Sequence, residues 1–220
     1  MRMAAVLAAV LAMGSILLSC DQSGPKTQAV YILVDRTGIY AHSFENIRMT
    51  ARVLLSKLSP GDSMAIARID NELFSSQDII AAVTFSSRPS NANKQKRALF
   101  NAVDKLANEQ KVGSYTDVTG GLLKATEWLN ATRASKKIII IFSEFPDEPR
   151  IGYMQAFPVN YNGANVLVWN AIAPLADEGV TLTESRSFAE RVSAWKARVN
   201  NDGGKWQVIN NVADVITALN

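Results

Sequence analysis

The chain has 220 residues, of which 48% are hydrophobic and 20% are charged. This is the usage of an ordinary globular domain and excludes a disordered, collagen-like or coiled-coil protein. One cysteine and one histidine exclude an internal disulfide, a cysteine-based zinc site and a pair of histidine ligands. The net charge of +3 comes without a dense basic stripe, so we expect no nucleic-acid partner.

The N-terminal segment carries one positive charge, Arg2, followed by an apolar run from Met3 to Leu18. This run is short for a membrane-spanning helix, which needs about 20 residues. A positive charge followed by an apolar run of this length is typical of a secretory signal. We therefore expect residues 1–19 to direct export, and an uncleaved anchor helix is the alternative.

The apolar run ends in Leu17-Leu18-Ser19-Cys20, which resembles the lipobox of bacterial lipoproteins. The resemblance implies cleavage before Cys20 and acylation of that cysteine, commonly with palmitate, so that the protein is held on a membrane of the cell envelope. Asp21 resembles an inner-membrane retention signal, which favours the periplasmic side of the inner membrane in a Gram-negative organism. Residues 20–28 then form a lipidated cysteine and a polar tether.

The remaining chain, residues 29–220, alternates between strand-like and helix-like patterns. The continuous apolar run from Ala29 to Val34 predicts a strand that is buried on both faces. We expect further strands at 63–69, 79–85, 137–142, 166–172 and 206–209, and helices at 44–58 and 92–109, from Val118, from near Thr183 and after Asn211. The last of these carries Asn211 and Asp214 at the positions of a capping box.

This alternation predicts an α/β fold with a doubly wound, mainly parallel six-stranded sheet and helices on both faces. The link at 70–78 is polar and has no helical pattern, so the second and third strands are expected to form a hairpin with one antiparallel edge strand. In sheets of this kind, ligands bind beyond the carboxyl ends of the strands.

Polar side chains follow three predicted strand ends or helix starts. Asp35 and Thr37 follow the first strand, Thr116 precedes the helix at Val118, and Glu144 follows the apolar strand at 137–142. Carboxylate and hydroxyl oxygens suit a hard divalent cation such as Mg²⁺, Mn²⁺ or Ca²⁺. These residues are the candidate metal ligands.

This order of elements and residues resembles a von Willebrand factor A domain with its metal-ion-dependent adhesion site. The resemblance covers nearly all of residues 29–220, and it implies that Asp35, Thr37, Thr116 and Glu144 hold the metal. The site is degenerate, because Ile39 replaces one hydroxyl ligand and Glu144 stands where the family has aspartate. The resemblance further implies a protein partner that offers an exposed carboxylate, with no small-molecule substrate and no enzymatic activity.

Two alternatives use the same residues. Thr116 is a plausible helix N-cap and Asp35 a plausible partner of Arg36, which would leave a metal-free structural scaffold in a secretion or transfer assembly. The run from Asp35 to Gly38 also resembles the start of haloacid-dehalogenase phosphoryl-transfer enzymes, with Asp35 as nucleophile and Ser143 in a supporting role. A second aspartate, expected at position 37 in the soluble phosphatases of that group, is missing.

A long segment at 146–162 contains Tyr153, Phe157 and Tyr161. Long loops are often functional, and aromatic residues are enriched at protein interfaces. We therefore predict that these three side chains contact the partner. The alternative is that they fold back as a lid on the edge of the sheet.

Overall fold

The computed structural model describes residues 26–36, 44–69, 78–108, 117–143, 145, 158–169 and 182–220. The described elements are β1 (Gln28–Asp35), α2 (Phe44–Lys57), β2 (Ser63–Ile69), β3 (Ile79–Thr84), α3 (Pro89–Asn108), α4 (Val118–Ala131), β4 (Lys136–Phe142), β5 (Asn165–Trp169), α7 (Leu182–Asn201), β6 (Lys205–Ile209) and α8 (Val212–Leu219). The predicted signal peptide and Cys20 lie outside the described residues, as does most of the tether. In the described part of the chain, no helix is long and apolar enough to cross a membrane.

The described strands form one six-stranded sheet in the order β3-β2-β1-β4-β5-β6. Neighbouring strands are parallel, except that β3 runs antiparallel to β2 at the edge of the sheet. The predicted mainly parallel sheet with an antiparallel edge strand is therefore confirmed. This is also the arrangement that the resemblance to a von Willebrand A domain implies.

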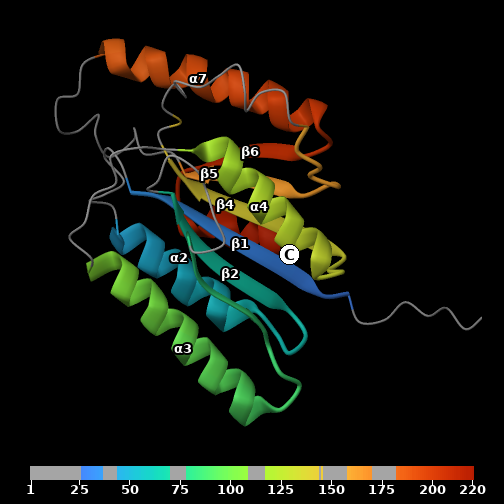
Figure 1. Cartoon of the computed structure of the whole chain (residues 1–220). Helices are drawn as coiled ribbons and strands as arrows, with labels where there is room; N and C mark the ends of the chain where they lie inside the picture. Colours follow the sequence, from blue (N-terminus) through green and yellow to red (C-terminus); the bar gives the residue numbers. More distant parts are fainter. Residues whose placement is uncertain are drawn as a thin grey trace, which may run out of the picture.

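The central strands are apolar on both faces because helices cover both sides of the sheet (Figure 1). Val30, Ile32 and Val34 of β1 face a core shared with α2, α3 and α8. The alternate residues Tyr31 and Leu33 face a second core shared with α4 and α7. Among the residues that the structure describes, the members of both cores lie between positions 29 and 219.

Helix ends follow local signals in the sequence. The Asn211 side chain accepts a hydrogen bond from the Asp214 backbone N–H, and the Asp214 carboxylate accepts one from the Asn211 N–H, which confirms the predicted capping box. Helix α3 begins at Pro89, three residues before the predicted start. Proline favours the first turn of a helix because it has no N–H to leave unsatisfied there.

The register of β5 and β6 provides a direct test of the two-sided packing. Val168 and Val208 are register partners on these neighbouring strands, yet Val168 is fully buried and Val208 is 38% exposed. We expect Val168→Ala to lower the free energy of unfolding by about 2 kcal/mol, and the matched Val208→Ala to lower it by about 0.5 kcal/mol or less. Urea unfolding followed by circular dichroism measures both. Equal losses would contradict the described burial.

Candidate functional site

Two polar residues meet at the carboxyl ends of the central strands. Asp35 is the last residue of β1, and Ser143 follows the last residue of β4. Because these strands are parallel and Val34 is in register with Phe142, the next residue on each strand reaches the same point. The Ser143 hydroxyl donates a hydrogen bond of 2.7 Å to Oδ2 of Asp35.

This pair is enclosed by protein. Asp35 is 1% exposed and Ser143 is fully buried, so the carboxylate depends on polar groups of the protein rather than on water. Beside it, the Arg36 backbone N–H donates to the Ile69 carbonyl at 3.0 Å, which extends the pairing of β1 with β2. The Arg36 side chain is also buried and adds a positive charge to this edge.

Ser143 also contacts the backbone of Phe145. The Ser143 hydroxyl accepts a hydrogen bond of 3.0 Å from the Phe145 backbone N–H, and Phe145 has a φ of 50°, in the left-handed region that bulky residues rarely adopt. Packing supports this conformation, because the buried Phe145 ring lies 5.5 Å from the ring of Trp195 and 5.4 Å from that of Trp206. The Ser143 hydroxyl therefore bonds to both the Asp35 carboxylate and the Phe145 backbone.

Helix α4 begins beside the same edge. A Cβ atom added to Gly121 would lie 2.9 Å from a methyl group of Leu33 and 3.3 Å from one of Ile69, both near the carboxyl ends of their strands. The missing side chain thus allows α4 to start close to β1 and β2. The N-cap is Asp117, whose side chain accepts a hydrogen bond of 2.7 Å from the Gly120 N–H. The interpretation of Thr116 as the N-cap is wrong, since its neighbour has that role.

Only one of the predicted metal ligands lies within the residues that the structure describes. Asp35 lies at the predicted edge, whereas Thr37, Thr116, Glu144, Tyr153, Phe157 and Cys20 lie outside the described residues. Within the described ranges, no three His, Cys, Asp or Glu side chains form a group that could hold a metal ion. The contact of Ser143 with Asp35 was not predicted as part of a metal site. The feature of the sequence that could have indicated this contact is the position of Ser143, directly after the apolar strand and one residue before Glu144.

The prediction that Tyr161 contacts a partner is wrong. Its side chain is 1% exposed and belongs to the core between the sheet and α7. A Cβ atom on Gly204 would lie 3.0 Å from the Tyr161 ring, so the ring packs directly against the turn before β6. Burial raises the pKa of the Tyr161 phenol above its ordinary value; Arg198 lowers it and Asp202 raises it. Tyr161 is therefore a core residue.

Comparisons with known proteins gave structural matches only. No protein-family model matches the chain, and no curated protein matches it. A von Willebrand factor type A protein from Catenulispora acidiphila has 13% identity and a TM-score of 0.48, covering 87% of this chain and 41% of that one. A variant of the PilB minor pilin from Streptococcus sanguinis has 12% identity and a TM-score of 0.48, covering 90% and 62%.

A third solved structure is the conserved hypothetical protein BatB from Bacteroides thetaiotaomicron. It has 12% identity and a TM-score of 0.49, covering 87% of this chain and 96% of that one. The present chain thus spans less than two thirds of the first two structures, at 41% and 62% of their lengths.

The hydrogen bond between Ser143 and Asp35 can be measured by a double-mutant cycle with Ser143→Ala, Asp35→Ala and the double variant. A hydrogen bond to a buried charged group contributes about 1.5–3 kcal/mol. We expect a coupling energy of about that size in the free energy of unfolding. The cycle is needed because Ser143→Ala also removes the acceptor of the Phe145 N–H, a loss that does not depend on Asp35. A coupling near zero would mean that the two side chains do not interact.

Proposed function

We propose that this chain is a lipid-anchored protein of the bacterial envelope, with a von Willebrand A-like domain that binds a protein partner at the carboxyl edge of its sheet. The observation that supports this most strongly is the buried pair of Asp35 and Ser143 at the centre of that edge. A carboxylate is costly to bury, and here it lies where open α/β sheets bind their ligands. The partner would therefore dock over β1 and β4.

The chemistry of this edge suits a hard divalent cation. The Asp35 carboxylate and the Ser143 hydroxyl are oxygen donors of the kind that Mg²⁺ and Ca²⁺ prefer. Asp35 would hold the ion together with Thr37, Thr116 and Glu144, while Ser143 fixes the orientation of the Asp35 carboxylate. A bound ion would supply an open coordination position for a carboxylate of the partner.

A metal-free scaffold is the second candidate, and one observation favours it. The Asp35 carboxylate already accepts a hydrogen bond of 2.7 Å from Ser143, so the protein itself supplies a compensating polar group. Ile39 also replaces one of the hydroxyl ligands that the family uses. In this case the domain would bind its partner through the shape and polar groups of the edge alone, as part of a larger envelope assembly.

Metal binding separates these two candidates. We expect isothermal titration of residues 21–220 with Mg²⁺, Mn²⁺ or Ca²⁺ to show saturable binding that Asp35→Ala and Thr116→Ala each abolish, because both residues would contribute oxygen ligands. Glu127→Ala is the matched control, since Glu127 is an exposed carboxylate on α4 that pairs with Lys124. No binding at millimolar metal, or equal loss in the control, would favour the metal-free scaffold.

The same variants test the absence of enzymatic activity. We expect no hydrolysis of a phosphate ester by residues 21–220, with or without Mg²⁺. Hydrolysis that disappears in Asp35→Asn would contradict the binding-module proposal, and it would support the phosphoryl-transfer alternative, in which Asp35 is the nucleophile.

Tyr153 and Phe157, the two remaining predicted contacts in the 146–162 segment, are expected to contribute to partner binding. Tyr153→Ser with Phe157→Ser should reduce cross-linking of the full-length protein to its envelope partner at least about tenfold, because aromatic contacts dominate many interfaces. Quantitative mass spectrometry of cross-linked membranes measures this loss, and thermal unfolding of the same variant should be unchanged. Met49→Ser, at a residue on α2 that is 42% exposed, is the control. Unchanged cross-linking in the double variant would show that the partner binds elsewhere.

A further inference from the structure

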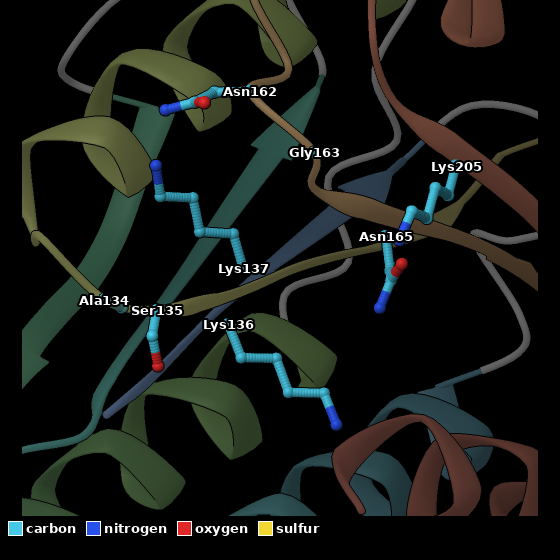
Figure 2. Close-up of a pocket in the computed structure, with 8 residues that line it drawn as sticks. All are labelled: Ala134, Ser135, Lys136, Lys137, Asn162, Gly163, Asn165 and Lys205. Atoms are coloured by element: carbon cyan, nitrogen blue, oxygen red, sulfur yellow. The ribbon is translucent and has the colours of Figure 1, made fainter. Parts of the chain in front are cut away.

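A second polar site lies at the opposite edge of the sheet, where β4, β5 and β6 begin. It is a hollow of about 430 Å³, shown in Figure 2. The residues that line it are Ala134, Ser135, Lys136, Lys137, Asn162, Gly163, Asn165 and Lys205. Three of these are lysines and none is acidic, so the hollow suits an anionic group.

The lysines differ in their roles. Lys137 Nζ donates to Oδ1 of Asn130 at 2.7 Å, and Asn162 donates to the same oxygen at 3.3 Å, so Lys137 helps to join the end of α4 to the loop before β5. Figure 2 shows Lys137 extending toward Asn162, whereas Lys136 extends the opposite way from the same strand. Lys136 and the exposed Lys205 are therefore the cations best placed to receive a ligand.

The positive charge continues along this amino edge, which comprises the starts of the parallel strands and the adjoining helix ends. Exposed cations are present directly before β1, at the end of α2, before α3 and after α4: Lys26, Lys57, Arg88 and Arg133. Described carboxylates near this edge are engaged within the protein. Asp62 is buried and accepts from two backbone N–H groups, Asp202 accepts from the Val159 N–H, and Glu127 pairs with Lys124.

The chain enters the domain at this same place. The Thr27 carbonyl accepts hydrogen bonds from the backbone N–H groups of Ser135 and Lys136 at 3.1 and 3.3 Å, and from the Ser135 hydroxyl at 3.1 Å. Thr27 is thus fixed against residues that line the hollow. Six residues separate it from Cys20, a stretch that spans at most about 25 Å when fully extended.

We propose that the amino edge docks on a bilayer that contains anionic phospholipids, with lipid phosphates at Lys136 and Lys205. This inference rests on the proposed anchoring at Cys20, which would hold the edge within one short tether of the membrane. A lysine near an anionic bilayer strengthens binding about fivefold, corresponding to about 1 kcal/mol. Lys136 and Lys205 together would then change the docking equilibrium roughly thirtyfold, and the carboxyl edge would face away from the membrane.

The single cysteine allows a direct test. Residues 20–220 are coupled through Cys20 to a maleimide lipid in vesicles of phosphatidylcholine, with or without phosphatidylglycerol. Acetylation of each lysine by a water-soluble reagent is followed by mass spectrometry. With phosphatidylglycerol, we expect Lys136 and Lys205 to react at least about fivefold more slowly, while the exposed Lys105 and Lys196 on α3 and α7 react unchanged. Equal rates in both kinds of vesicle would overturn the proposal.

Two further experiments separate docking on a bilayer from binding of a small anion. Docking of the amino edge should also protect Lys26 and Lys57 from acetylation. Lys136→Gln with Lys205→Gln should weaken docking roughly thirtyfold, measured as faster acetylation of Lys26 and Lys57, whereas the matched Lys105→Gln with Lys196→Gln should not. In the second experiment, inorganic phosphate is added to the protein coupled to phosphatidylcholine vesicles. If phosphate alone protects Lys136 and Lys205, the hollow is a small-anion site and bilayer docking is wrong.

The anchor itself is tested separately in cells. Loss of palmitate labelling and release from the membrane in Cys20→Ser would support the lipoprotein proposal. Unchanged membrane association in that variant would contradict the anchor, but the vesicle experiment would still give an answer, because its tether is made chemically. The two proposals can therefore fail independently.

Discussion

The pairing of β1 with β2 on one side and β4 on the other is the constraint on which the rest of the structure depends. It places β1 inside the sheet, so both faces of this strand need a helical layer. Residues alternate between the two layers: Ile32 contributes to the core with α2, α3 and α8, and Leu33 to the core with α4 and α7. A strand that is apolar at every position from Ala29 to Val34 is stable only inside a sheet that is covered by helices on both faces.

The same pairing explains why the polar residues of the carboxyl edge lie where they do. Asp35 comes at the point where the apolar run ends, and parallel pairing brings Ser143 next to it. Gly121 then allows α4 to begin against Leu33. A carboxylate in this position is a liability for stability unless it is hydrogen-bonded. Asp35 ends the apolar run of β1 at the carboxyl edge, and this position supports the proposed role of that edge in binding.

Much of this fold follows from the sequence because the signals are local. The apolar strands, the hairpin of β2 and β3 and the cap at Asn211 each depend on a few consecutive residues. The errors concern contacts between distant segments. Tyr161 resembled a surface aromatic, but its ring packs against the distant Gly204. Ser143 was predicted to act with Asp35 only in the phosphoryl-transfer alternative, and their hydrogen bond follows from the register of β1 and β4. The N-cap was misplaced by one residue, because Thr116 and Asp117 are both good caps.

The two edges of the sheet differ in charge and in chemistry, and the chain enters β1 at only one of them. β1 has eight residues and, at about 3.3 Å per residue, separates the edges by about 26 Å. In Figure 1 the chain enters β1 at the right. A lipid anchor at Cys20 would hold this basic amino edge close to the bilayer, with the parallel strands directed away from the membrane. The buried carboxylate of Asp35 would then lie at the far edge, beyond the headgroups. A partner reaching it would come from the aqueous side, so anchoring and recognition would not compete for the same surface.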